Sequence, residues 1–166
     1  MAVYKKFLIQ QQSYNGTSYV NVGGVVDTYT AYGIVCQEFP FKYLPESKEL
    51  AKRDWSDEHG DDVYVPTDGM KMKAYDVEAK FLYSGSKAEM ATKIKNFVKF
   101  IYGRNEGGAP MLSVYDEYTQ TGRRGVYVTE IDEDIYFYSN TSLGGIASFK
   151  VKFRVTDPVT DITLVG

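Results

Sequence analysis

Residues 54–62, with the sequence DWSDEHGDD, hold the densest group of side chains that could bind a metal ion or transfer a proton. The segment contains five carboxylates, the only histidine and the only tryptophan of the chain, namely Asp54, Trp55, Asp57, Glu58, His59, Asp61 and Asp62. A calcium loop of the EF-hand type requires glycine at its sixth position and a bidentate glutamate at its twelfth. Counted from Asp54, the glycine is the seventh residue and the twelfth is Val65, so the segment does not match. An acidic connector, exposed or at a subunit contact, remains as an interpretation beside an adventitious cation site.

The other residue types that carry out catalysis do not form a recognisable site. Zinc sites usually use more than one nitrogen or sulfur ligand, and the chain has one histidine and one cysteine, Cys36. Cys36 lies in the apolar run GIVC, which favours a small packed side chain over a nucleophile. The sequence has no G-x-S-x-G motif, and its single imidazole gives a Ser-His-Asp triad little support. We therefore expect no catalytic residue, no metal site, no cofactor and no enzymatic activity.

Three further polar segments have ordinary structural explanations. The acidic run at 132–134 is expected in a turn between two strands, where acidic residues are common. Arg123 and Arg124 are expected at the tip of a hairpin, in a turn over 122–125, where a solvated position is simpler than a phosphate or acidic partner. The glycine-rich loop at 103–108 follows a helix and lacks the Lys-Ser/Thr pair of a phosphate-binding loop.

The composition is that of one globular, β-rich domain. A chain of 166 residues, 43% hydrophobic and 25% charged, is long enough to bury a core. Its 15 tyrosines and 9 phenylalanines favour β-structure, where an aromatic ring packs on the pleated surface. The net charge of −3 argues against binding through nucleic-acid phosphates, which needs a basic surface.

Neither a secretory signal nor a membrane span is predicted. The apolar stretch that follows Lys5 and Lys6 is too short for a signal peptide. No run approaches the roughly 18 apolar residues that a spanning helix needs. We expect a soluble chain that is made in a cytosol.

Alternation of apolar and polar residues predicts most of the strands. A strand over 76–83 places every second residue from Val77 to Tyr83 on one face, and the last strand, 146–156, does the same from Phe149 to Val155. The Asn15-Gly16 pair predicts a hairpin with a two-residue type I′ turn. Further strands are expected over about 3–13, 17–22, 31–41, 110–118, 125–131 and 134–139.

One long helix is predicted over about residues 87–102. Ser86 and Glu89 have the spacing of a capping box, and Gly103 provides a C-terminal stop. Apolar residues recur at helical spacing at positions 91, 94, 97, 98 and 101. This stripe suits a helix that lies across a sheet.

The predicted fold class is mostly β (α+β), a two-sheet β-sandwich or distorted barrel with the long helix packed across it. Residues 1–166 are expected to form a single domain. Within it, residues 45–65 are rich in charge and poor in apolar side chains, which predicts a long charged connection, with a helical turn near 46–52.

The order of these elements resembles the N-terminal ring-forming domain of phage distal tail proteins and, more loosely, the tail-tube fold. A β-rich first part leads to the strand YDVEAKFLYSGS, the helix KAEMATKIKNFVKFIYG, the strand MLSVYDEY and the hairpin RRGVYVTEID. The last strand ends in the family-like phrase F-x-V-x-D-P, supplied by Phe153, Val155, Asp157 and Pro158. The resemblance covers roughly residues 60–162. Many distal tail proteins continue into a further C-terminal domain, whereas a minimal form, a tube subunit or another tail-completion protein would all fit a shorter chain.

The resemblance implies a structural protein of a phage or prophage tail, made in the cytoplasm of the bacterial host and located in the virion tail. Its copies would form a six-fold ring or a tube segment around a channel, stacked on other tail proteins. DNA would pass through the channel without specific binding, and no membrane would be involved. In that setting, residues 54–62 would either line the channel and repel DNA phosphates, or form an inter-subunit loop with Trp55 as its anchor.

Two functions from other classes remain as alternatives. A monomeric β-sandwich module could recognise a carbohydrate or a protein through aromatic residues such as those at 136–138. A hydrolase that uses the acidic cluster would show dependence on a divalent metal. The oligomeric state separates the first of these from a tail ring.

Overall fold

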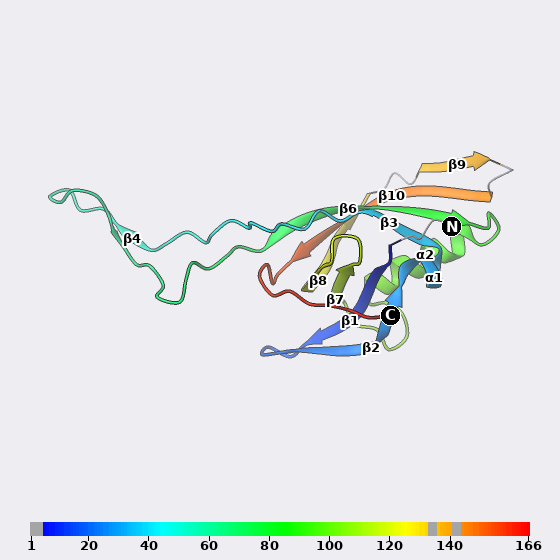
Figure 1. Cartoon of the computed structure of the whole chain (residues 1–166), viewed down its shortest axis with the longest axis horizontal. Coiled ribbons are helices and arrows are strands. Elements are labelled where there is room, and N and C mark those ends of the chain that lie inside the picture. Colours follow the sequence, from blue (N-terminus) through cyan, green and yellow to red (C-terminus); the bar gives the residue numbers. More distant parts are fainter. Residues whose placement is uncertain (1–4, 133–135, 141–143) are drawn as a thin grey trace.

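The computed structural model describes residues 5–132, 136–140 and 144–166. Its elements, in chain order, are β1 (Phe7–Tyr14), β2 (Tyr19–Asp27), α1 (Thr28–Tyr32), β3 (Ile34–Glu38), β4 (Lys52–Arg53), β5 (Asp62–Val63), β6 (Tyr75–Gly85), α2 (Met90–Ile101), β7 (Met111–Asp116), β8 (Thr121–Ile131), β9 (Tyr136–Asn140) and β10 (Gly144–Val155). Figure 1 shows a body that contains both helices and all strands except β4 and β5, which lie in a long projection. The mostly-β class with one long helix is confirmed.

The body is built from one antiparallel sheet rather than two separate ones. Its strand order is β2-β1-β7-β8-β10-β6-β3. Strand β6 pairs with one edge of β10 from Gly145 to Val155. Two strands share the other edge of β10: β8 pairs along Val151–Val155, and β9 pairs along 144–148. Strands β2 and β3 end this order without pairing with each other in the described part of the chain, so the sheet is a distorted, open barrel.

The sheet curls until strands far apart in its order face each other across the core. Three strands separate β1 from β6, yet the ring centroids of Phe7 and Phe81 are 5.9 Å apart. Phe81 also contacts the rings of Phe97, Phe149 and Phe153, at 5.3, 5.8 and 6.3 Å. Aromatic side chains from three strands and from α2 therefore form one core.

The two alternating strands follow their sequence pattern. In β6, the residues from Tyr75 to Tyr83 alternate between buried and more exposed, and the odd-numbered ones are buried. In β10, Phe149, Val151, Phe153 and Val155 are all buried. The prediction for these two strands is confirmed, because a period of two fits a sheet that is buried on one face.

Helix α2 packs its apolar side chains onto the inner face of the sheet. Ile94, Phe97, Phe100 and Ile101 are buried. The helix begins at Met90, not at 87, and the predicted capping box is wrong: Glu89 is the N-cap but makes no side-chain capping bond. Its end is as expected, since Gly103 adopts a left-handed φ of 69°. A Cβ atom there would also lie 2.3 Å from the carbonyl carbon of Ala109.

Three local turn predictions are wrong. The first hairpin has a four-residue loop, 15–18, in which the Asn15 side chain accepts hydrogen bonds from two backbone N–H groups. The segment 122–125 lies inside β8, and the turn before it is at 117–120. The segment 46–52 contains no helical turn. Of the acidic run at 132–134, only Asp132 is among the described residues, so the turn predicted for this run lies outside them.

Neither helix in the described ranges is long and apolar enough to cross a lipid bilayer.

We expect the substitution Phe81→Ala to destabilise the body by about 3–5 kcal/mol, because it opens a cavity among aromatic rings that cannot collapse together. Phe81 is fully buried. Chemical denaturation measures the change, and Phe81→Leu, which leaves a smaller cavity, gives a second value if the alanine variant does not fold. The control is Leu44→Ala, because Leu44 is 93% exposed and its loss should change the free energy of unfolding by less than about 0.5 kcal/mol. Equal effects at the two positions would contradict this description of the core.

Candidate functional site

Residues 42–74, which we call the arm, leave the body between β3 and β6. Figure 1 shows the arm extending along the long axis of the molecule, with β4 near its far end. The predicted connection at 45–65 therefore lies wholly within the arm. At about 3.3 Å per extended residue, a limb of some fifteen residues can reach roughly 50 Å from its origin.

The arm is a hairpin of two extended limbs that bond to each other at intervals. Near the body, the N–H of Lys48 donates to the carbonyl of Lys71 and that of Lys73 to the carbonyl of Glu46, both at 2.7 Å. Farther out, the N–H of Tyr64 donates to the carbonyl of Ala51 at 2.9 Å, next to the short β4–β5 ladder. The limbs start side by side because the strands that carry them, β3 and β6, are paired neighbours in the sheet.

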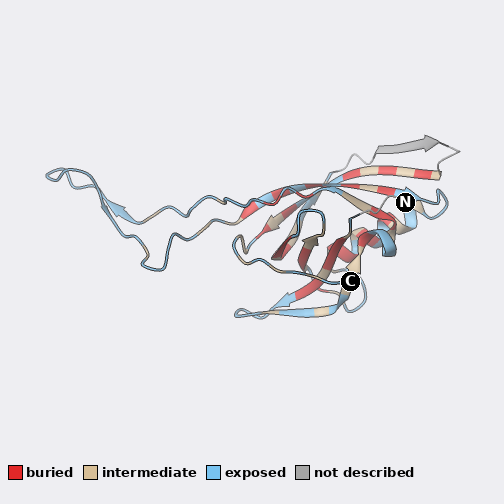
Figure 2. Ribbon diagram, in the orientation of Figure 1, coloured by how far each residue is buried: buried red, intermediate tan, exposed pale blue. Residues whose placement is uncertain are grey.

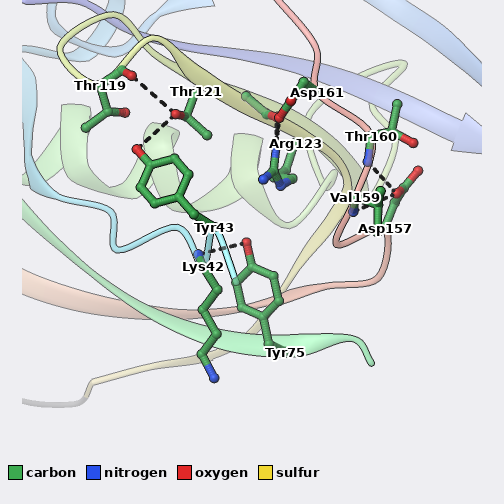
Figure 3. Close-up of polar contacts among 11 residues, drawn as sticks. Lys42, Tyr43, Tyr75, Thr119, Thr121, Arg123, Asp157, Val159, Thr160 and Asp161 are labelled. Carbon is green, nitrogen blue, oxygen red and sulfur yellow. Dashed lines mark hydrogen bonds and ion pairs between the residues drawn. The ribbon is translucent and has the colours of Figure 1, made fainter. Parts of the chain in front are cut away.

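Aromatic residues anchor the root of the arm in the body. Phe39 and Phe41 are both buried, with ring centroids 4.6 Å apart, and Phe39 also contacts Phe153 at 5.4 Å. Figure 3 shows two polar contacts at the root: the backbone N–H of Lys42 donates to the Tyr75 hydroxyl at 3.3 Å, and the hydroxyls of Tyr43 and Thr121 lie 3.0 Å apart. These contacts fix the direction in which the arm leaves the body.

Beyond its root the arm has no core of its own. The structure describes every residue from 42 to 74, and none of them is buried (Figure 2). Seven large hydrophobic side chains on the arm are at least 40% exposed, namely Tyr43, Leu44, Trp55, Val63, Tyr64, Val65 and Met70. Contiguous exposed apolar patches mark interaction sites in many proteins.

The predicted acidic cluster lies at the outer end of the arm, in residues 54–62, which we call the tip. The cation of Arg53 lies 5.9 Å from the centroid of the Trp55 ring, and the N–H of Glu58 donates to the carbonyl of Trp55 at 3.2 Å. Every residue of the tip is exposed. Within the described ranges, no group of three or more His, Cys, Asp or Glu side chains lies together as metal ligands.

The phrase F-x-V-x-D-P has a structural role at the end of β10. Phe153 and Val155 are fully buried in the core. Asp157, followed by Pro158, organises the turn after the strand: its carboxylate accepts hydrogen bonds from the N–H groups of Val159 and Thr160, at 3.3 and 3.1 Å (Figure 3). The phrase thus marks where the sheet ends and the last segment, 157–166, turns back across the body.

Arg123 and Arg124 hold this last segment, a role that sequence analysis missed. Arg123 is 4% exposed and forms an ion pair with Asp161, and Arg124 Nε donates to Asp157 Oδ2 at 2.8 Å. Gly122 permits the close approach, because a Cβ atom there would lie 2.4 Å from the carbonyl oxygen of Ile162. The glycines that suggested a turn in fact let a second segment cross the strand.

The exposed face of the sheet carries a row of compensated charges. Four cross-strand ion pairs follow it, with N–O distances of 3.1–3.5 Å: Lys80–Glu38, Lys150–Glu78, Lys152–Glu130 and Arg154–Asp76. Each cation of this row has a carboxylate beside it, so the face has little net charge. Exposed pairs of this kind each stabilise a fold by less than about 1 kcal/mol.

The single cysteine, Cys36, does not have the setting of a nucleophile. Burial raises the pKa of the Cys36 thiol, with a smaller contribution from the Asp116 carboxylate, so Cys36 stays protonated at neutral pH. Cys36 packs against the core, as its apolar run predicts. A cavity lined by Phe81, Phe149 and Lys150 measures about 90 Å³, below the usual size of a ligand site, and two larger hollows of about 470 and 520 Å³ lie along the limbs of the arm.

The sequence matches no family model and no curated protein. Among solved structures, the chain is similar to the Dit protein of phage SPP1, a hub adsorption apparatus protein of phages that infect Gram-positive bacteria, with 14% identity and a TM-score of 0.47. That alignment covers 90% of this chain and 50% of the Dit protein, so the chain spans half of the Dit protein's length. It is also similar to a chain from the tail of an empty GTA particle with C6 symmetry, with 10% identity, a TM-score of 0.36 and coverage of 95% and 96%. At these values the likeness assigns no role to any residue.

We expect Asp157→Asn to destabilise the protein by about 1–2 kcal/mol at neutral pH, because it weakens the contacts with Arg124 and the following turn. Desolvation raises the pKa of the Asp157 carboxyl, but hydrogen bonds from Arg124, Thr160 and Val159 outweigh it, and the pKa lies below its ordinary value. A carboxylate with a lowered folded-state pKa stabilises the fold above its unfolded pKa of about 4 and loses this contribution as the pH falls through the folded value.

Urea denaturation at about pH 7, 5 and 3 tests this linkage. The difference between the natural protein and Asp157→Asn should shrink at the lowest pH. The matched control, Asp61→Asn, changes an exposed carboxylate at the tip and should leave the free energy of unfolding unchanged at neutral pH. A difference that stays constant from pH 7 to 3 would contradict the role of Asp157.

Proposed function

We propose that this chain is a non-enzymatic structural protein of a phage or prophage tail that assembles with copies of itself into a ring or tube segment around a channel. The expected symmetry is six-fold, and other tail proteins would stack on the ring. The protein would lie in the tail of the virion after synthesis in the bacterial cytoplasm.

The observation that carries this proposal is the exposed arm. Ordering an extended segment costs about 1–2 kcal/mol per residue in backbone entropy, and no residue from 42 to 74 buries its side chain to offset that cost. A neighbouring subunit that covers Tyr64, Val65 and Trp55, which are 72, 56 and 47% exposed, would supply the missing burial. An arm that projects from one subunit and is covered by the next is a heterologous contact, the type that closes into rings.

Two further features support self-assembly into a tail structure. The elements from β6 through α2, β7 and β8 to β10 follow the order on which the resemblance to distal tail proteins rests. Strands β2 and β3 form the two ends of the sheet, and their outer backbone groups could pair with strands of another subunit.

Two roles for the tip remain as proposals. An inter-subunit contact through Trp55 agrees with the exposed arm, whereas a channel lining would place Asp57, Glu58, Asp61 and Asp62 beside passing DNA. Reversing these four charges separates the roles in whole particles. If assembly and DNA delivery both stay intact, the channel role is excluded.

Native mass spectrometry over a range of concentrations, with electron microscopy of the same samples, tests the proposal. We expect hexamers or longer stacked assemblies with a central channel, because the arm surface is buried only between copies. A chain that stays monomeric at every concentration and shows no ring would overturn self-assembly and favour a monomeric binding module.

We expect Trp55→Ala to weaken self-association by about tenfold or more, because large aromatic side chains at the centre of an interface supply much of its binding energy. The fold of the monomer should not change, since Trp55 lies outside the core. Sedimentation measures the dissociation constant, and denaturation of the monomer measures the free energy of unfolding. The matched control is Tyr118→Ala, which removes a 77% exposed aromatic ring outside the arm and should leave association unchanged. Equal dissociation constants for Trp55→Ala and the natural protein would exclude Trp55 as the anchor.

A further inference from the structure

The outward face of α2 is a basic surface that nothing in the described chain covers. Lys95 and Lys99 lie one turn apart on the exposed side of the helix, opposite the buried Phe97 and Ile101. Neither lysine belongs to an ion pair among the described residues, whereas Lys93 lies 3.5 Å from Glu89. We call Lys95 and Lys99 the helix lysines.

The tip carries the opposite charge in excess. Its nine residues include five carboxylates and no lysine or arginine. None of these carboxylates takes part in an ion pair in the part of the chain that the structure describes. By contrast, the cations of the exposed sheet face each have a carboxylate partner. The tip and the helix lysines therefore carry unpaired charge of opposite sign. They are not the only such groups, since Lys48, Lys52 and Arg53 on the arm also have no ion pair among the described residues.

These two surfaces lie at opposite ends of the molecule. In Figure 1, whose horizontal direction is the longest axis, β4 lies near the left end and α2 lies in the right half of the body. The root contacts of Phe39, Phe41 and Tyr43 hold the arm in this direction. The tip of one chain therefore cannot reach its own α2, while the tip of a second copy placed head to tail can reach it.

We propose that the tip of one copy docks on the outward face of α2 of the next copy, with Asp57 and Asp61 facing Lys95 and Lys99. The inference rests on the proposed self-assembly and identifies the two surfaces that meet. Trp55 would lie against the aliphatic stems of the lysines, since long cationic side chains cover apolar surface while their charged ends pair. Because the two surfaces differ, the contact is heterologous and repeats from copy to copy until a ring closes.

Paired charge reversals test this contact. The tip variant is Asp57→Lys with Asp61→Lys, and the helix variant is Lys95→Glu with Lys99→Glu. Each alone places like charges at positions 57 and 61 of one copy and at positions 95 and 99 of the next, and should weaken self-association by about tenfold or more. Mixed in equal amounts, the two variants present opposite charges at every contact of an alternating assembly, so association should return. The chain that carries all four substitutions should associate as well.

Controls separate this contact from general effects of charge and from folding. Lys5→Glu reverses an exposed lysine outside α2 and should leave association unchanged, whereas the single change Lys95→Glu should weaken it. Circular dichroism checks that each variant folds. At about 1 M salt, where the screening length falls to roughly 3 Å, the difference between the natural protein and either double variant should narrow.

The outcomes distinguish this inference from the proposed function. If the natural protein forms rings and the reversed variants form them equally well, the docking surface is overturned and self-assembly stands. The docking surface is likewise overturned if each double variant fails to associate and their mixture fails too. A natural protein that remains monomeric under all conditions would overturn both.

Discussion

Strands β6 and β10 pair through eleven consecutive residues, from Tyr75 with Val155 to Gly85 with Gly145, and the rest of the molecule depends on this ladder. Every second residue of both strands faces the aromatic core. The ladder thus presents Phe81 to α2 and to the facing strand β1, Phe149 to α2, and Phe153 to Phe39 at the root of the arm. The same ladder positions the arm, because Tyr75 is both the first residue of β6 and the acceptor for the backbone of Lys42 at the root. A shift of this register by one residue would move every core side chain of β6 to the outer face.

The arm extends the β3–β6 hairpin beyond the layer that stabilises it. Within the body, β6 lies against α2 and β3 lies against α1. Outside the body, the limbs keep only intermittent backbone bonds, and their side chains have no second layer to pack against. A two-stranded hairpin on its own is marginally stable in water, which gives the arm a physical reason to require a partner surface.

Charge is distributed in two different ways over this protein. On the exposed sheet face, cations and carboxylates alternate across strands and compensate each other locally. The five carboxylates of the tip, and Lys95 and Lys99 on α2, take part in no ion pair among the described residues, and Lys52 and Arg53 lie next to the tip along the chain. Compensated faces remain hydrated and weakly interacting, whereas uncompensated surfaces of opposite sign attract each other and set the orientation of association.

The sequence alone determined the parts of the protein that depend on local periodicity. The alternation in 76–83 and 146–156 predicted two strands with one buried face, and the helical spacing of Ile94, Phe97 and Ile101 predicted α2. The charge density of 54–62 predicted an acidic connector, exposed or at a subunit contact, and every residue of it is exposed in this chain. The sequence predicts these features because one side of a regular strand or helix faces the core and the other faces solvent. Buried residues therefore recur with the period of the strand or helix.

Only the tertiary structure decided how distant residues meet. Gly122 and Gly125 are compatible with a turn and equally with a second segment that passes close to the strand backbone. The local sequence therefore could not predict that Arg123 pairs with Asp161 and Arg124 with Asp157. The capping-box spacing at 86–89 is present in the sequence, but the Tyr83 hydroxyl donates to the carbonyl of Ser86 and the helix begins later. The direction of the arm likewise depends on Phe39, Tyr43 and Tyr75, whose partners are far away along the chain. Contacts between distant residues leave no periodic pattern in the sequence, because the packing of the whole sheet sets their geometry.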